Sequence, residues 1–382
     1  MRKGKIVIGG DIFPRNGLDL FEQGRIDILF SKEIIDLFAK ADLSICNLEG
    51  ALTNSESKLP KCGPSIKAPP ETVAGIKKLG VDCLALANNH VTDYGSEGYG
   101  ETCRTLSKCG ISYFGAGPNI NNIQTNYRKT INDKTVIFYA VGETVFNIPS
   151  ADSAGINLYD EYRVCNELKE LKKQCDCLIV LYHGGVEYFQ FPTPWIRTRF
   201  HRMADNGADI IIAQHTHCIG TQENYNGSYL LYGQGNFHFI QNNKKDVTQT
   251  GLLMEIDLGD NGFDIRPHLI HRNGDMAQYD DRQDLSDFFE RSQRLEDGDT
   301  FEKEFSVYSE EWMLKWLLEF RGLTLKDKIM KKILSPEKFY NYMRKDYSDF
   351  TVLRMLEHVR GEEDVEVMQK GLSDFYGRNR KG

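Results

Sequence analysis

Short apolar runs that are rich in β-branched residues recur along most of the chain. Each run has the length and the residue types of a buried β-strand. The runs begin at residues 5, 43, 83, 135, 177, 209, 229 and 251. Amphipathic helical patterns lie between the earlier runs, at residues 31–40, 70–79, 96–109, 161–174 and 194–206. Strands that alternate with helices predict an α/β domain.

The later runs, between residues 229 and 258, follow one another with only loops between them. Neighbouring parallel strands need a long crossover connection, which short loops do not provide. These runs therefore predict a mixed sheet, or a second sheet packed on the first, rather than a purely parallel sheet.

The pattern changes after about residue 272. A polar stretch, HRNGDMAQYDDRQDL, precedes long amphipathic patterns such as EEWMLKWLLEFRGL and TVLRMLEHVRG, which are typical of helices. We therefore expect one domain at residues 1–272 and a helical C-terminal extension at residues 273–382. The apolar faces of these helices need a partner. That partner is either the same subunit, with the extension covering the site, or a second subunit in a homo-oligomer.

Polar residues follow one predicted strand after another, at the point where each strand ends. In an open α/β sheet the carboxyl ends of the strands surround one crevice, so these side chains are expected to meet there. Carboxylates, amide oxygens and imidazoles suit divalent Mn, Zn, Fe or Mg, and the near absence of cysteine disfavours a structural zinc site. The residues are Asp11, Asn47, Glu49, Asn88, Asn89, His90, His183, His215 and His217.

Such a set is suited to two metal ions. Two ions about 3.5–4 Å apart can clamp an ester or phosphoryl oxygen and lower the pKa of a water molecule between them. This chemistry needs a carboxylate that bridges both ions, and either Glu49 or Asp11 could serve. His215 and His217 are two residues apart, so in an extended chain both imidazoles point the same way. One could bind each ion, or one could bind while the other contacts the substrate.

Charge, apolar segments and cysteine content indicate which partners and which compartment to expect. The 47 Lys and Arg against 55 Asp and Glu leave a formal charge of −8, so nucleic acid is not expected as the main partner. The N-terminus has only a very short apolar stretch and no segment is long enough for a bilayer, so we expect neither a signal peptide nor a membrane span. Nine cysteines without zinc or disulfide spacing indicate reduced thiols and a cytoplasmic protein.

The ordered motifs resemble those of a known family. GGDIF, NLEGALT, LANNHVTDYG, HGGVEY, QHTHCIG and YGQGNFHF, between residues 9 and 239, look like the motif set of the CapA-type family of poly-γ-glutamate capsule synthesis proteins. That family is similar in fold to the calcineurin-like metallophosphoesterases. The resemblance implies a sandwich of two mixed β-sheets flanked by helices.

The resemblance also implies roles for individual residues. Asp11 would be the first metal ligand, and Glu49 would stand in place of the bridging aspartate of the wider superfamily. Asn89 would be a ligand, and His90 would contact the substrate oxygen or protonate the leaving group. The remaining ligands of the two ions would be His183, His215 and His217.

One position departs from the wider superfamily, which usually has Asp-x-His in its first motif. Position 13 is Phe here, so one imidazole ligand is missing. Glu187 could replace that ligand or carry a proton. Asp93, three residues after His90, could accept the second ring N–H of His90 and set its tautomer. Arg15 and Arg197 are candidate anion contacts, although an arginine at the surface is the simpler interpretation of each.

Two functions are compatible with these residues. The first is a metal-dependent, phosphoesterase-like hydrolase that acts on an acidic polymer or a phosphoester, with metal-activated water, in bacterial capsule or surface-polymer synthesis. The second is a non-catalytic component of a capsule synthesis or export complex that binds the polymer. The ligand set favours the first, and the pathway follows from the family resemblance alone.

Overall fold

The computed structural model describes residues 4–61, 63–143, 148–239, 246–260, 262–298, 300–309, 322–345, 351 and 355. The chain divides into two compact units, Met1–Phe305 and Ser306–Gly382. The first unit contains the β-sheets and all of the candidate site residues.

The larger sheet of the first unit has eight strands in the order β18-β17-β16-β1-β2-β5-β6, with β15 paired to β1. Strands β1, β2, β5 and β6 run parallel, whereas β16 is antiparallel to β1 and to β17. The sheet is therefore mixed. Its strands are β1 (Gly4–Ile12), β2 (Leu43–Leu48), β5 (Cys83–Ala85), β6 (Ser112–Phe114), β15 (Asn236–His238), β16 (Thr250–Gly259), β17 (Gly262–Asn273) and β18 (Met276–Tyr279).

The second sheet has six strands in the order β13-β14-β12-β11-β9-β8. Its central strands β9, β11, β12 and β14 are parallel, and β8 and β13 are antiparallel at the edges. These strands are β8 (Asn126–Ile131), β9 (Lys134–Gly142), β11 (Cys177–His183), β12 (Ile210–Gln214), β13 (Gln222–Tyr225) and β14 (Ser228–Leu231). Two short pairs complete the strands: β3 (Ala51–Leu52) with β4 (Lys67–Ala68), and β7 (Ala116–Gly117) with β10 (Gly155–Ile156).

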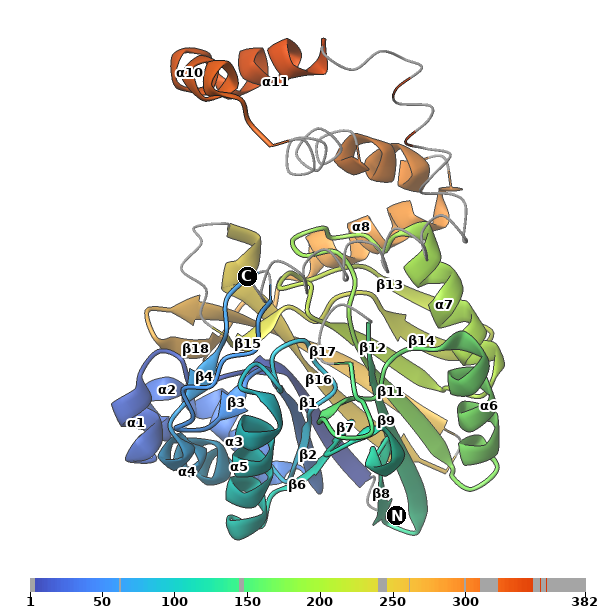
Figure 1. Cartoon of the computed structure of the whole chain (residues 1–382). Coiled ribbons are helices and arrows are strands. Elements are labelled where there is room, and N and C mark those ends of the chain that lie inside the picture. Colours follow the sequence, from blue (N-terminus) through green and yellow to red (C-terminus); the bar gives the residue numbers. More distant parts are fainter. Residues whose placement is uncertain are drawn as a thin grey trace. The chain divides into compact units, whose positions relative to one another are not determined.

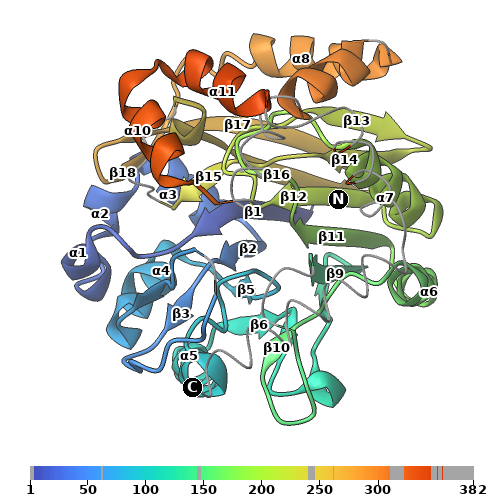
Figure 2. The same cartoon turned by 45° about the horizontal axis from the view of Figure 1, so that its top comes forward.

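Helices flank the two sheets. Helices α1 to α5 lie on one side of the first unit, and α6 and α7 lie on the other (Figure 1). They are α1 (Leu18–Glu22), α2 (Ile26–Leu29), α3 (Lys32–Lys40), α4 (Val73–Leu79), α5 (Gly95–Lys108), α6 (Glu161–Lys172) and α7 (Pro194–Asp205), with 3-10 turns at Pro70–Thr72, Ile120–Asn122 and Asp246–Gln249. Side chains from both sheets, such as Ile8, Ile45, Phe138 and Ile179, belong to one hydrophobic core. The turned view in Figure 2 shows the strands between these helices.

The predicted sandwich of two mixed sheets flanked by helices is confirmed. Every apolar run that predicted a strand forms one: β1, β2, β5, β9, β11, β12, β14 and β16. The helical patterns correspond to α3, to α4 with the 3-10 turn before it, and to α5, α6 and α7. Strands β17 and β18 lack an apolar run because most of their positions are exposed or half-buried; β18 is the edge strand of the sheet, and β17 lies next to it.

The first unit extends past the predicted domain boundary at residue 272. Strand β18 pairs with β17. Helix α8 (Ser286–Glu296) buries Phe288 and Leu295, and its Ser292 hydroxyl accepts a hydrogen bond from the backbone N–H of Gln222, at 2.9 Å. Burial of this apolar face makes α8 part of the first unit, which ends at Phe305.

The described part of the second unit is helical. Helices α10 (Leu325–Ile333) and α11 (Pro336–Arg344) follow one another in this unit. The amphipathic patterns that begin at residues 310 and 351 lie almost wholly outside the described residues. Among the described residues, no helix combines the length and the hydrophobicity needed to cross a bilayer.

An ion-pair network joins α7 to β13. Arg197 donates two hydrogen bonds to Glu223, at 3.1 and 2.7 Å. This arginine is therefore held in an ion pair within the protein, rather than being a solvated arginine at the surface. His201 and the Tyr232 hydroxyl also contact Glu223, at 3.1 and 2.8 Å. Burial by itself raises the pKa of Glu223, but the hydrogen bonds from Arg197, Tyr232 and His201 hold it below its ordinary value.

Replacing Glu223 by glutamine should therefore destabilise the fold in a pH-dependent way. The Glu223→Gln variant leaves the Arg197 guanidinium without its anion, and we expect the free energy of unfolding at pH 7 to fall by about 2 kcal/mol. A carboxyl with a lowered pKa stabilises the fold only while it is ionised, so the difference from wild type should shrink as pH falls below about 4.5. Urea denaturation at pH 7 and pH 4 measures both effects. The exposed pair Glu161–Arg202 is the control, because Glu161→Gln should change stability little.

Candidate metal centre

The carboxyl ends of parallel strands from both sheets bring the candidate residues together. Asp11 lies near the end of β1, and Glu49 directly follows β2. Asn89 follows β5 in a tight turn. His183 is the last residue of β11, and the turn that carries His215 and His217 follows β12. Because these strands are parallel within each sheet, their ends meet on one side of the sandwich.

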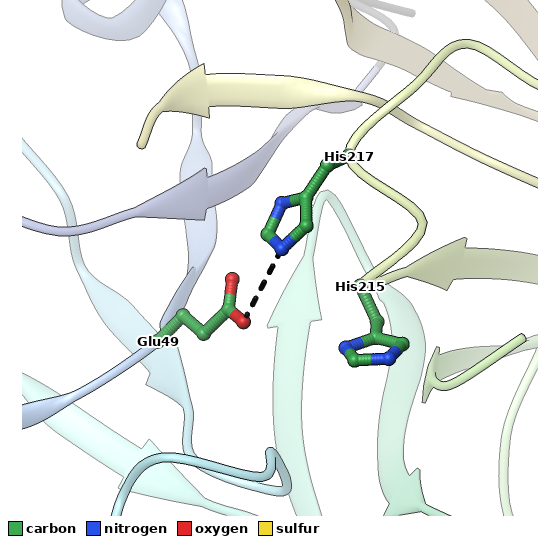
Figure 3. A group of neighbouring side chains, drawn as sticks. All are labelled: Glu49, His215 and His217. Carbon is green, nitrogen blue, oxygen red and sulfur yellow. Dashed lines mark ion pairs between the residues drawn. The ribbon is translucent and has the colours of Figure 1, made fainter. Parts of the chain in front are cut away.

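Glu49 lies at the centre of this group. Its side chain is fully buried, and neither oxygen of its ionised carboxylate accepts a hydrogen bond from a described residue. Its Oε1 lies 3.7 Å from His183 Nε2 and 3.8 Å from His217 Nε2. One ligand atom each from Glu49, His215 and His217 lies within 4.8 Å of the others, and Figure 3 shows both imidazoles beside the carboxylate.

Burial raises the pKa of Glu49 well above its ordinary value, and the nearby Asp11 raises it further, by its charge and by accepting a hydrogen bond from the protonated Glu49 carboxyl. A buried carboxylate without hydrogen bonds is costly unless a positive charge compensates it. Carboxylate oxygens and imidazole nitrogens are also the ligand types that divalent Mn, Zn and Fe prefer. The residues present therefore fit a divalent metal ion.

The Asp11 carboxylate is held in place by two donors. Asn47 Nδ2 donates to its Oδ1 at 2.7 Å, and the backbone N–H of His215 donates to its Oδ2 at 3.1 Å. The ring Nδ1 atoms of His183 and His217 each lie 3.9 Å from one of its oxygens. Burial raises the pKa of Asp11, although His217 and these hydrogen bonds oppose that effect.

The amide of Asn236 sets the tautomer of His217. The side-chain Nδ2 of Asn236 donates to the carbonyl oxygen of Thr248 at 3.1 Å, so its Oδ1 faces His217 Nδ1 at 2.9 Å. An amide oxygen only accepts, so Nδ1 carries the proton and the lone pair of Nε2 points toward Glu49. Phe239 stacks on the ring, with centroids 4.9 Å apart. Asn236 was not a predicted site residue, and its only signal in the sequence is its place in the YGQGNFHF motif.

His183 and Asn89 lie together on another side of Glu49. The Oδ1 of Asn89 is 3.0 Å from His183 Nε2, and Asn47 Nδ2 is 3.3 Å from His183 Nδ1. Burial lowers the pKa of His183 well below its ordinary value, and the neighbouring histidines lower it further. Burial also lowers the pKa values of His215 and His217. All three imidazoles are therefore neutral, which is the form that binds a metal.

His90 forms a cluster with Asp93 and Lys61 at the edge of the site. Its Nδ1 lies 2.7 Å from Asp93 Oδ2, which also accepts the backbone N–H of Ile66 at 2.8 Å. This is the contact predicted from the three-residue spacing. Lys61 forms an ion pair with Asp93, and its Nζ lies 3.0 Å from the carbonyl oxygen of Asn89 and 3.1 Å from His90 Nδ1. Lys61 lies in a polar loop, so no pattern in the sequence could have indicated its position.

Two further glutamates lie near the candidate metal ligands. Glu187 is half-buried and acts electrostatically on Glu49, His215 and His217. Its predicted role as ligand or proton carrier stays a prediction. Glu143, which follows β9, lines a small pocket whose other residues include Asn89, His183 and His215. Its Oε1 accepts hydrogen bonds from the Tyr182 hydroxyl at 3.0 Å and from Arg199 at 3.3 Å.

The sequence predicted that His215 and His217 point the same way because they lie two apart in an extended chain, and this explanation is wrong. Strand β12 ends at Gln214, and His215 and His217 have φ angles of 87° and 53°, in the left-handed region. A turn, rather than the alternation of an extended strand, aims the two imidazoles at Glu49. Residues other than glycine seldom adopt this conformation, and such strain is concentrated at functional sites.

All of the predicted metal ligands are thus gathered around one buried carboxylate, and their assignment as ligands stays a prediction. Phe13, at the position where the wider superfamily has a histidine, is fully buried and packs 6.4 Å from the ring of Phe239. An apolar ring therefore occupies that position. Arg15 is exposed.

The sequence model described as bacterial capsule synthesis protein PGA_cap matches residues 5–241, a span that contains every candidate ligand. The chain belongs to this family, as the order of its motifs predicted. Capsule biosynthesis protein CapA of Bacillus anthracis is 30% identical over 203 residues, which are 52% of this chain and 49% of that protein. PGA biosynthesis protein CapA of Bacillus subtilis (strain 168) is 29% identical over 258 residues, which are 65% of this chain and 67% of that protein. The match thus spans about half the length of the first relative.

Solved structures of low sequence identity are similar to the chain. A novel phosphatase from Mycoplasma pneumoniae is 16% identical with a TM-score of 0.45, over 76% of this chain and 100% of that chain. A 5′-nucleotidase precursor from Thermus thermophilus is 10% identical with a TM-score of 0.42, over 81% of this chain and 59% of that chain. At these sequence identities and TM-scores, the structural similarity supports no conclusion about activity.

Removing the charge of Glu49 should have opposite effects without and with metal. In EDTA, we expect Glu49→Gln to unfold at a higher temperature than wild type, because the amide removes a buried charge. Added Mn²⁺ or Zn²⁺ should raise the unfolding temperature of wild type by mass action and that of the variant much less. Thermal unfolding and metal analysis check both effects. The exposed Glu71→Gln variant should behave as wild type, and equal metal stabilisation of Glu49→Gln would contradict the assignment.

The hydrogen bond from His217 to Asn236 should contribute to metal affinity. We expect Asn236→Ala to weaken binding by about 10–100-fold, because the His217 ring loses the acceptor that sets its tautomer. Asn236→Asp keeps an acceptor at the same place and should retain more affinity. Titration calorimetry with Zn²⁺ on the three proteins measures this order, and equal affinities would show that Asn236 only holds its loop.

Proposed function

We propose that the chain is a metal-dependent, phosphoesterase-like hydrolase that acts on an acidic polymer or a phosphoester precursor in capsule or poly-γ-glutamate synthesis. The observation that carries this proposal is the buried Glu49 carboxylate, which in its ionised form accepts no hydrogen bond from a described residue and faces neutral imidazoles. A carboxylate in that position would help to hold a divalent cation and to neutralise its charge. The pathway is supported by the family and by the printed names of the Bacillus relatives.

The chain offers enough ligands for two divalent ions, of Mn, Zn, Fe or Mg. Bound ions supply positive charge that polarises an ester or amide oxygen and lowers the pKa of a water molecule. The protein's part is to hold the ligands in one geometry, through Asn47 on Asp11 and Asn236 on His217. The residues that would hold the ions are Asp11, Glu49, Asn89, His183, His215 and His217.

His90 is suited to transfer a proton. Its Nδ1–H donates to Asp93, so Nε2 is the ring nitrogen left to contact the substrate. Lys61 balances the charge of Asp93 from the other carboxylate oxygen. This arrangement fixes the ring, and in its doubly protonated form, beside the Asp93 carboxylate, the ring could give the Nε2 proton to a leaving oxygen or nitrogen.

The proposal is tested with the purified chain loaded with Mn²⁺ or Zn²⁺. Turnover is measured on p-nitrophenyl phosphate, bis-p-nitrophenyl phosphate, γ-glutamyl p-nitroanilide and poly-γ-glutamate. For whichever substrate is cleaved, we expect His90→Asn to lower kcat by about 100-fold or more with unchanged metal content. His271→Asn, on strand β17 and not among the candidate site residues, is the matched control and should keep full activity.

One result would contradict the role of His90, and another would contradict the proposed hydrolysis itself. Turnover that persists in His90→Asn would remove the proton-transfer role of His90. Stoichiometric metal binding without turnover of any substrate, together with retention of poly-γ-glutamate by the wild type, would favour the non-catalytic polymer-binding function instead.

A further inference from the structure

The start of helix α10 in the second unit is fixed by capping hydrogen bonds. Thr324 and Asp327 form a capping box, in which each side chain accepts a hydrogen bond from the backbone N–H of the other residue, at 3.2 and 2.9 Å. The Asp327 carboxyl is almost fully buried and also contacts the Tyr342 hydroxyl of α11, at 3.4 Å. These contacts fix the rotation of α10 about its own axis relative to α11.

One face of α10 is already used for packing. Met330 and Leu334 contact Phe339 and Met343 of α11, and these side chains form the small hydrophobic core of the helix pair. Helices α10 and α11 are drawn together in Figures 1 and 2. The packing face of α10 therefore lies on the side of Asp327 and Met330.

A second apolar face of α10 is exposed. Leu325, Ile329 and Ile333 are four residues apart and form one stripe along the helix. They are 77%, 50% and 69% exposed, which is unusual for three large aliphatic side chains in a row. Lys326 lies at one border of this stripe, and Lys328 and Lys332 lie at the other, because the helix advances by about 100° per residue.

The charge of α10 has one sign. The helix carries Lys326, Lys328, Lys331 and Lys332, and its only acidic residue, Asp327, is buried in the cap. The whole chain, in contrast, has a formal charge of −8. An exposed apolar stripe with lysines along both borders is the pattern of a helix that lies in the plane of a membrane interface.

We propose that this face of α10 is a docking surface for anionic lipid membranes. Leu325, Ile329 and Ile333 enter the boundary between head groups and acyl chains, and the lysines contact lipid phosphates. Charge complementarity selects this occupant over a second copy of the chain, since pairing two such faces would bring like-charged lysine rows together. The surface contains none of the candidate metal ligands, and it does not depend on the proposed hydrolysis.

The full chain is tested by co-sedimentation with vesicles of phosphatidylcholine alone and of phosphatidylcholine with phosphatidylglycerol. We expect binding to the anionic vesicles that weakens strongly when the salt concentration rises from about 0.05 to about 0.5 M. Leu325→Ser/Ile329→Ser/Ile333→Ser should lower the partition coefficient by about tenfold or more. Lys326→Gln/Lys328→Gln/Lys332→Gln should abolish the preference for anionic vesicles while keeping the apolar stripe.

A matched control removes as many exposed apolar side chains from the first unit. Ile28→Ser/Ile120→Ser/Ile148→Ser should bind vesicles as wild type does, because these residues are exposed but lie outside α10. Unchanged far-UV circular dichroism shows that each variant is folded.

Several results would overturn the inference. Equal binding of wild type to neutral and anionic vesicles would do so, as would absence of binding or binding by the triple-serine variant at the wild-type level. Light scattering that shows a wild-type dimer, a monomeric triple-serine variant and no vesicle binding would instead identify the stripe as an interface between copies.

Discussion

The Glu49 carboxylate is buried where parallel strands of two sheets end, and its charge constrains the structure around it. Neither oxygen of the ionised carboxylate accepts a hydrogen bond from a described residue, so this form is stable only beside a positive charge. The surrounding imidazoles do not supply that charge, because burial keeps the pKa values of His183, His215 and His217 low. This combination is unfavourable for stability and favourable for binding a divalent cation.

The neighbouring amides then determine how the ligands point. Asn47 contacts both Asp11 and His183, so one side chain on β2 orients groups that come from β1 and β11. Asn236, on β15, orients the ring of His217. The left-handed backbone at His215 and His217 adds conformational strain, and it is this backbone conformation that directs the two rings toward Glu49. Local strain, buried charge and oriented amides occur together here, as expected of a site that is pre-organised for a ligand.

The two units differ in what their side chains offer to a ligand or partner. The first unit contains the candidate metal centre and belongs to the capsule synthesis family along most of its length. In the second unit, a helix pair with its own small core leaves apolar and basic side chains exposed. The family match ends at residue 241, before this helix pair begins.

Residue patterns along the chain determined the strands, the helices and the identity of the candidate ligands. Apolar runs mark central strands because both faces of those strands are buried, whereas β17 and β18, which are largely exposed or half-buried, lack such a signal. Only the tertiary structure showed that Lys61, Glu143 and Asn236 surround the ligands, because their places result from loop paths and contacts between distant segments. It also showed that a turn aims His215 and His217, and that α8 belongs to the first unit. These features depend on backbone torsion angles and on packing across the two sheets, which the order of residues alone does not reveal.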